Sequence, residues 1–202
     1  MAQDAWKRAR SASDFTIFEP LLAKTVDLKR REAEIVGPAK HLYDNLLDSF
    51  EPGLTVDVIT PIFDRLRTGT VALLSEITPR QQDVNDDVLY RSYNPDAQLA
   101  SATRIIKTLG FDMNTGRVDL SAHPFCTSFG STDVRLTTRI RENDLRSCLF
   151  GLIHEAGHGM YEQGIGTDLA RTFSGQGASM GIHESQSLFW ENVVARSEEF
   201  WN

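Results

Sequence analysis

Two histidines four residues apart, with a glutamate directly after the first, constrain this chain more than any other feature of its sequence. The segment reads His154-Glu155-Ala156-Gly157-His158. Side chains four residues apart on an α-helix lie one above the other on the same face, so both imidazoles can reach a single metal ion. The spacing therefore predicts a zincin-like helix that carries two ligands of a metal site. The alternative is a helix with two solvated histidines.

The residues around this motif predict that the same helix also has an apolar face. A helical pattern runs from about residue 142 to residue 163, and it contains one apolar stripe: Leu145, Cys148, Leu149, Leu152, Ala156 and Met160. At about 100° per residue, this stripe centres on the side opposite His154 and His158. We therefore expect the stripe to pack into the core and the histidines to face a site. Gly157 costs up to about 1 kcal/mol relative to alanine inside a helix, which suggests that another part of the chain approaches its backbone closely.

A catalytic zinc ion needs a third protein ligand and an open position for water. Our candidate is Glu184, which follows His158 by 26 residues and lies near the start of a last predicted helix, residues 181–201. Two helices joined by a glycine-rich segment can pack antiparallel and bring Glu184 to the histidines. Glu184 could instead only stabilise the N-terminus of its own helix through the helix dipole. His183 is a rival ligand, but neighbouring residues on a helix point about 100° apart, so we do not expect both to bind one ion.

A site with two histidines and a glutamate predicts the activation of a water molecule. Zinc would lower the pKa of a bound water toward neutrality and polarise a carbonyl group. Glu155 would take the proton from that water and then give it to a leaving amine, because it lies beside a ligand without coordinating the metal. Such a site accepts several divalent ions, and their availability often decides which one is bound.

The rest of the sequence predicts a mainly α fold with a small antiparallel sheet. Residues up to about 110 have helical periodicity, which includes one long helix over about 56–77. Residues 117–120 and 133–137 alternate polar and apolar side chains, which is typical of half-buried strands. The helix with the histidine motif and the following glutamate-bearing helix would complete the fold.

Length and composition predict one domain with neither a nucleic-acid nor a membrane partner. A chain of 202 residues is typical of a single domain, in which we expect a helical part at about 1–110 and the sheet and metal-site helices at about 111–202. The net charge of −7 opposes binding to nucleic acids and anionic membranes. No apolar run approaches the roughly 20 residues of a membrane span, and the N-terminus lacks a secretory signal. With only two cysteines, Cys126 and Cys148, the sequence predicts a cytoplasmic protein with reduced thiols.

Several short motifs occur in a fixed order along the chain. They are His123-Pro124-Phe125, Asp133-Val134-Arg135-Leu136-Thr137, His154-Glu155-Ala156-Gly157-His158 and His183-Glu184-Ser185-Gln186. Together they resemble the M32 family of metallocarboxypeptidases, also called the carboxypeptidase Taq family. The segments Leu42–Asp48, Glu51–Gly53 and Trp190-Glu191-Asn192 resemble the same family, so the similarity covers nearly the whole chain.

The resemblance implies a zinc- or cobalt-dependent enzyme that removes residues from the C-terminus of peptides. His154, His158 and Glu184 match the metal ligands of the family, and Glu155 matches its general acid and base. The implied substrate is a peptide with a free C-terminus. Family members are mainly helical, with a small sheet beside a deep groove, and are commonly homodimers.

His123 and Arg135 are candidate substrate-binding residues. Arg135 could bind a carboxylate through two hydrogen bonds, either the C-terminus of the substrate or Asp133 on the same strand face. Both residues could instead have structural roles. His123 would then be a hydrogen-bonded structural histidine, and Arg135 would form an ion pair that holds the sheet.

This chain is shorter than most members of the family, so we expect a natural short form or a central fragment. It has no counterpart of the downstream family motifs that surround the carboxylate of the substrate. Its apolar ending, Phe200-Trp201-Asn202, predicts an exposed apolar patch that drives self-association. Two other functions stay open at this point. One is a metal-binding scaffold or partner module with weak or no catalysis, and the other is a zinc aminopeptidase or endopeptidase with the same ligand set.

Overall fold

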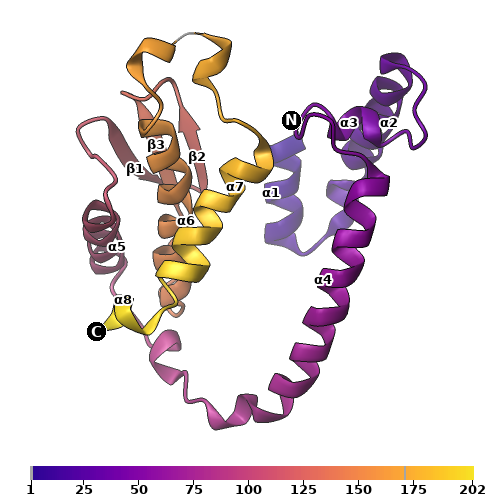
Figure 1. Ribbon diagram of the computed structural model, residues 1–202. Coiled ribbons are helices and arrows are strands. Elements are labelled where there is room, and N and C mark those ends of the chain that lie inside the picture. Colours follow the sequence, from indigo (N-terminus) through magenta and orange to yellow (C-terminus); the bar gives the residue numbers. More distant parts are fainter. Residues whose placement is uncertain (1, 171) are drawn as a thin grey trace. The chain divides into compact units, whose positions relative to one another are not determined.

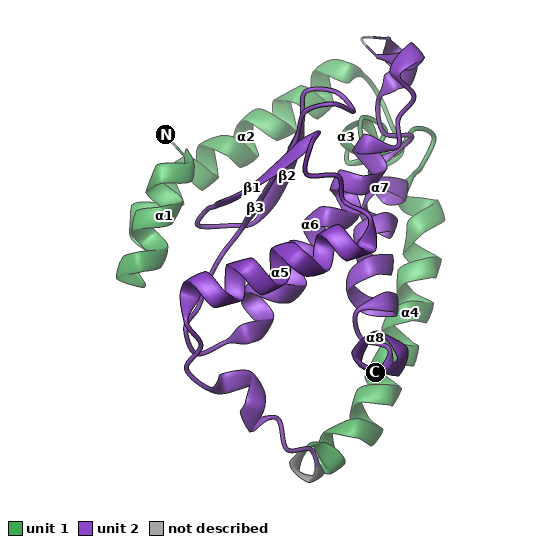
Figure 2. Ribbon diagram, turned by 90° about the vertical axis from the view of Figure 1, so that its left-hand side faces the viewer, with its two compact units in different colours: residues 1–81 green, residues 82–202 purple. Residues whose placement is uncertain are grey.

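The structure is a computed structural model that describes residues 2–170 and 172–202, with no side chains described for residues 82 and 83 (Figure 1). The chain divides into two compact units, residues 1–81 and residues 82–202 (Figure 2). The mainly α fold predicted from the sequence is confirmed. No described helix is long and apolar enough to cross a membrane.

The first unit is helical and buries only small side chains in its described part. Its elements are α1 (Ala2–Ala12), η1 (Phe15–Ile17), α2 (Glu19–Val36), α3 (Asp44–Leu47) and α4 (Val56–Ile77), and the 3-10 helix η2 (Thr78–Asp83) follows at the boundary. Asn45 ties α3 to the end of α2, because its Nδ2 donates to the carbonyl oxygens of Ala33 at 2.8 Å and Gly37 at 2.7 Å. The long helix expected over residues 56–77 is confirmed as α4.

Many apolar side chains of α4 are exposed. The helix buries none of its side chains, and its exposed large apolar residues are Val58, Ile62, Phe63, Leu66, Val71, Leu73, Leu74 and Ile77. Trp201, at the other end of the chain, is exposed as well. Exposed apolar side chains therefore occur in both units, and the apolar patch expected at the chain's ending stays a prediction. Self-association through such surface stays a prediction.

Helix α6 (Leu145–Gln163) packs against most elements of the second unit. One neighbour is α5 (Pro95–Leu109), which Asn94 caps at its start and Gly110 ends in the left-handed conformation with φ 117°. The short η3 (Asp87–Tyr90) precedes α5. The core gathers apolar side chains from α5, the sheet, α6 and two connecting segments: Ala102, Ile106, Phe111, Val134, Leu136, Cys148, Leu149, Leu152, Ile153, Ala156 and Ala195.

The small sheet is mixed, so the prediction of a purely antiparallel sheet is wrong in one of its two pairings. The strand order is β1 (Gly116–Leu120), β3 (Val134–Thr138), β2 (Phe125–Ser128). Strand β2 pairs antiparallel with β3 as a hairpin, but β1 pairs parallel with β3. The reason is that the chain passes from β1 to the far edge before β3 returns between them. The sequence pattern also missed β2, which is short and directly follows Pro124.

The predicted last helix over residues 181–201 is not continuous. It consists of α7 (Met180–Leu188), a π-helical turn η6 (Phe189–Val194) and α8 (Glu198–Trp201). Two short 3-10 helices, η4 (Thr167–Leu169) and η5 (Phe173–Gly175), lie in the glycine-rich connection that precedes α7. Ser179 caps α7 by accepting a hydrogen bond from the backbone N–H of Ile182. This cap fixes the residue at which the helix begins.

Candidate metal centre

Helix α6 has the two faces that its sequence predicts. Asp144 caps its start by accepting a hydrogen bond from the backbone N–H of Arg146. Four residues of the predicted apolar stripe are fully or almost fully buried: Cys148, Leu149, Leu152 and Ala156. The side chains of His154 and His158 are only partly buried, with exposed fractions of 22% and 13%. One face of α6 therefore packs into the core and the other presents imidazoles.

Gly157 lets α7 approach the backbone of α6. A Cβ atom added at Gly157 would lie 2.6 Å from the Cα of Ser187 and 2.9 Å from the carbonyl oxygen of Gln186, distances too short for real contacts. Helices α6 and α7 lie side by side in the structure (Figure 1). The close approach expected at Gly157 is confirmed, and it brings the α7 residue Glu184 to the histidine-bearing face of α6.

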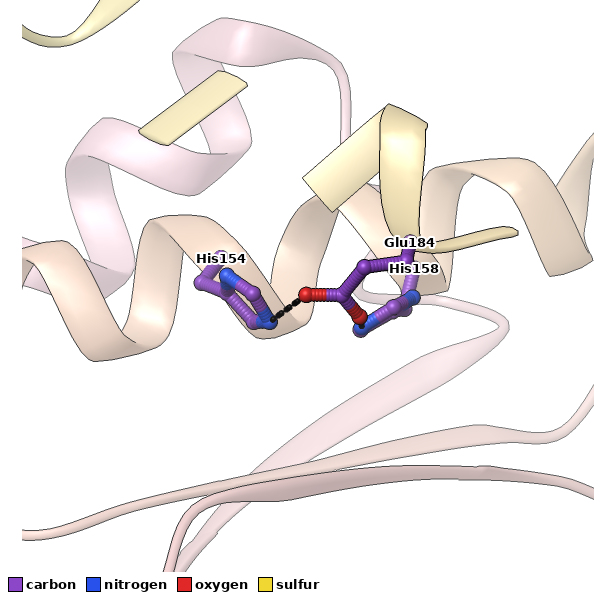
Figure 3. A group of neighbouring side chains, drawn as sticks. All are labelled: His154, His158 and Glu184. Atoms are coloured by element: carbon purple, nitrogen blue, oxygen red, sulfur yellow. Dashed lines mark ion pairs between the residues drawn. The ribbon is translucent and has the colours of Figure 1, made fainter. Parts of the chain in front are cut away.

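Glu184 meets both histidines of the motif (Figure 3). Its Oε1 lies 3.7 Å from Nε2 of His154, and its Oε2 lies 3.3 Å from Nε2 of His158. The three ligand atoms of this group lie within 4.8 Å of one another. Four ligands at about 2.0–2.1 Å from a tetrahedral zinc ion would be separated by about 3.3 Å. The donor set and its spacing therefore fit one divalent metal ion.

The Nδ1 atoms of both imidazoles, which lie on the side away from Glu184, have partners of their own. Nδ1 of His154 lies 2.9 Å from Oε2 of Glu191, and the other oxygen of Glu191 accepts a hydrogen bond from Nη2 of Arg196 at 3.0 Å. Nδ1 of His158 lies 2.7 Å from Nδ1 of His183. Both Nδ1 atoms are thus occupied, and both Nε2 atoms face Glu184. His183, the rival ligand, contacts His158 on the side away from Glu184.

Glu155 is a buried carboxyl group between α6 and the sheet. Only 7% of the residue is exposed, and burial raises the pKa of its carboxyl group to about 7. The negative charge of Glu184 raises this pKa further, whereas the charge of His154 and a hydrogen bond from the backbone of Cys126 lower it. Such a group can accept and release a proton near neutral pH. Burial, followed by the charges of His183 and His154, lowers the pKa of His158 to about 4, so its imidazole is neutral at pH 7.

The structure does not bring Arg135 into this group. Val134 and Leu136 of β3 belong to the core around α6, so Arg135 between them faces the other side of the sheet and is exposed. Its guanidinium donates two hydrogen bonds to Asp133, at 2.8 and 2.9 Å, and lies over the ring of Phe129. The ion pair with Asp133, one of the two partners considered for Arg135, is therefore present.

His123 lies in the exposed loop before β2. Its carbonyl oxygen accepts a hydrogen bond from Oγ of Ser121. The next residue, Pro124, lies beside α6, because a Cβ atom at Gly151 would be 3.6 Å from the Cγ of Pro124. The loop that carries His123 therefore runs along α6 one turn before His154.

Sequence reasoning missed the residues that orient the ligands. The sequence motifs include Glu191 only as part of a family-like segment, and they do not include Glu162, which contacts His183. A signal for Glu162 was present, because it follows His158 by four residues and so continues the face of His154 and His158. No comparable signal was available for Arg196, which lies beyond the π-helical turn.

Comparison with known proteins agrees with this geometry. A family model described as carboxypeptidase Taq (M32) metallopeptidase matches residues 1–202. The chain belongs to the M32 family of metallopeptidases. A relative, carboxypeptidase 1 of Bacillus subtilis, is 40% identical over 200 residues, which is 99% of this chain and 40% of the relative.

Solved structures have the same fold over this length. The crystal structure of BsuCP matches with a TM-score of 0.95 at 40% identity, and covers 99% of this chain and 40% of that chain. An M32 carboxypeptidase from Deinococcus radiodurans R1 matches with a TM-score of 0.86 at 38% identity, with the same coverage. The chain thus spans about 40% of the length of the relatives that it matches.

Proposed function

We propose that His154, His158 and Glu184 hold one divalent metal ion, zinc by preference and cobalt as the alternative, and that the site hydrolyses peptides from their C-terminus. The observation that carries this proposal is the convergence of two Nε2 atoms on the two oxygens of one carboxylate, at 3.7 and 3.3 Å. Two nitrogen ligands and one oxygen ligand form a set used by catalytic zinc in peptidases. When bound, the ion would polarise the scissile carbonyl group and acidify the attacking water.

In this proposal Glu155 is the general base and acid. Its carboxyl group interacts electrostatically with His154 and Glu184, two of the proposed ligands, but it does not belong to the ligand set. A pKa of about 7 suits a group that must first take a proton from water and then give it to the leaving amine. The backbone of Cys126 holds the carboxylate from the side of β2.

The specificity for the C-terminus is supported by the relatives, which are named carboxypeptidases. The proposed substrate is a peptide with a free C-terminal carboxylate. His123 and Arg135 stay predictions as substrate-binding residues, and the pairing of Arg135 with Asp133 weakens the prediction for Arg135. We also retain as predictions a single catalytic domain over residues 1–202, a cytoplasmic location and a homodimer.

Metal analysis is the first test of the proposal. We expect one zinc or cobalt ion per chain after reconstitution, and none in His154→Ala. His41→Ala is a matched control, because His41 pairs with Asp57 in the other unit and is not part of the group. A wild-type chain that binds neither ion would end the proposal.

Peptide hydrolysis is the second test. An N-blocked dipeptide with a free C-terminus should be cleaved by the reconstituted protein, and both chelation and Glu155→Gln should abolish the cleavage. The C-terminally amidated form of the same peptide should resist. Cleavage of the amidated peptide would favour an aminopeptidase or endopeptidase function. Metal binding without turnover would favour the scaffold function.

A further inference from the structure

A second histidine and a second glutamate lie behind the proposed ligand His158. Nδ1 of His183 lies 2.7 Å from Nδ1 of His158, and Nε2 of His183 lies 2.7 Å from Oε1 of Glu162. The two imidazole planes are only 19° apart and their centroids are 4.6 Å apart, so the rings lie nearly parallel while their Nδ1 atoms are in contact. Glu162, His183 and His158 thus form one line of hydrogen bonds that ends at the metal site.

The chemistry of the end group sets the direction of these hydrogen bonds. A carboxylate can only accept, so the hydrogen bond to Glu162 requires a proton on Nε2 of His183. A neutral His183 then has only a lone pair on Nδ1, so it must accept from Nδ1–H of His158. This leaves Nε2 of His158 without a proton, and that atom is the one that faces Glu184 at 3.3 Å.

His183 is held in place by its surroundings. The ring of Tyr161 packs edge to face against it with centroids 5.1 Å apart. A Cβ atom at Gly177 would lie 3.1 Å from Cδ2 of His183, so the glycine-rich connection also contacts the ring closely. Tyr161 in turn accepts a hydrogen bond from the backbone N–H of Ala178 at 3.1 Å. The side chains of His183 and Glu162 are mostly buried, which favours a fixed geometry over a solvated pair.

We propose that Glu162 and His183 are positioning residues that fix His158 as its Nδ1–H tautomer and aim its Nε2 at the metal ion. This inference rests on the proposed metal site. In this inference His183 orients the proposed ligand His158 and does not bind the metal ion itself. The two proposed histidine ligands then have different partners at Nδ1. Nδ1 of His154 contacts a carboxylate directly, whereas Nδ1 of His158 contacts an imidazole that is itself bound to a carboxylate.

The tautomer can be measured without metal. Long-range ¹H–¹⁵N correlation spectra of the full metal-free chain distinguish an imidazole protonated on Nδ1 from one protonated on Nε2. We expect the Nδ1–H form for His158 and the Nε2–H form for His183. The Nε2–H form at His158 in the wild-type chain would overturn the inference, and this result does not depend on whether any ion binds.

Metal affinity gives the second readout. Outer-shell partners of metal ligands typically contribute about 10–100-fold to affinity, so we expect His183→Leu to weaken zinc binding by that factor in competition with a chelator. In His183→Asn the side-chain oxygen can still accept from Nδ1–H of His158, so we expect this variant to restore most of the affinity. His41→Leu is the matched control and should bind zinc as the wild type does. An affinity loss of less than about tenfold in folded His183→Leu would contradict the inference.

The role of Glu162 is tested by a double-mutant cycle. Glu162→Ala should weaken zinc binding in the wild-type background but have little further effect in His183→Leu, because both changes break the same line of contacts. If the two changes weakened zinc binding independently, Glu162 would not act through His183, and the inference would be refuted. If His183→Leu does not fold by circular dichroism, the same cycle with His183→Asn and the tautomer measurement decide the question. A wild-type chain with the expected tautomers but no bound ion would refute the proposed function and leave the hydrogen-bond assignment standing.

Discussion

Glu191 of the π-helical turn η6 forms a hydrogen bond with His154 of α6, with 2.9 Å between Oε2 of Glu191 and Nδ1 of His154. Its second oxygen is held by Arg196 at 3.0 Å, so the carboxylate is fixed from both sides. A carboxylate behind a histidine ligand selects the ring tautomer and increases the basicity of the ligand nitrogen. The chain therefore supports its proposed metal site from outside the ligand set.

Removal of the Glu191 carboxylate should weaken metal binding without unfolding the chain. We expect Glu191→Ala to lower zinc affinity by about 10–100-fold, because His154 loses the partner that orients it. Glu191→Gln keeps an oxygen that can accept from Nδ1–H and should have a smaller effect. Chelator competition measures both, with the exposed Glu199→Ala as a control. Equal affinity in Glu191→Ala and the wild type would show that His154 needs no such support.

The buried carboxyl group of Glu155 should make the metal-free chain less stable as the pH rises. Its pKa is raised from 4.5 to about 7 in the folded state, so between these values the folded chain keeps a proton that the unfolded chain has lost. Glu155 therefore favours folding at low pH, and this contribution is lost as the pH rises through about 7. Glutamine cannot ionise, so Glu155→Gln should become more stable than the wild type by on the order of 3 kcal/mol at pH 8.

Urea unfolding in the presence of a chelator measures this difference at several pH values. The gap between Glu155→Gln and the wild type should be smallest near pH 4 and should level off above the folded pKa of about 7. The exposed Glu34→Gln in the other unit should show no such trend. A gap that does not change with pH would contradict the raised pKa.

A methyl group at position 157 should separate α6 from α7. The added Cβ would meet backbone atoms at 2.6 and 2.9 Å, and backbone atoms can move only with their helix. We expect Gly157→Ala to destabilise the chain by roughly 1–3 kcal/mol and to weaken zinc binding, because Glu184 moves with α7. Gly69→Ala is the matched control, since a Cβ there has nothing within 4 Å in helix α4. That change should stabilise the chain by up to about 1 kcal/mol. Unchanged zinc affinity in Gly157→Ala would show that the site tolerates a shift of α7.

The parts of the site that could be predicted from the sequence are those set by one helix. The spacing of His154 and His158 and the opposite apolar stripe depend only on helical periodicity, and both are as expected. The glycine at position 157 correctly indicated a close neighbour but could not identify it as the backbone of α7. The expected packing of two helices predicts Glu184 as the third ligand, and the structure brings its carboxylate to both imidazoles.

The parts that could not be predicted depend on contacts between distant segments. Strand β1 pairs parallel with β3 because of the path of the chain, which an alternating pattern does not reveal. The π-helical turn after Leu188 changes the phase of the last helix, so the direction of Glu191 could not be read from α-helical spacing. The contact between His183 and His158 likewise depends on the packing of α7 on α6.

The pairing of Arg135 with Asp133 leads to a last prediction, which separates its two possible roles. Both side chains are about half exposed, and exposed ion pairs contribute little to stability, so we expect Arg135→Ala to change the Tm only slightly. Since Arg135 faces away from α6, zinc affinity should fall by less than about tenfold, the lower end of what the loss of an outer-shell partner costs. An Arg135→Ala variant that keeps its metal but has a raised KM, with kcat unchanged, would show that Arg135 binds substrate after all. If instead KM and metal affinity both stay at their wild-type values, Arg135 has only a structural role, in its ion pair with Asp133.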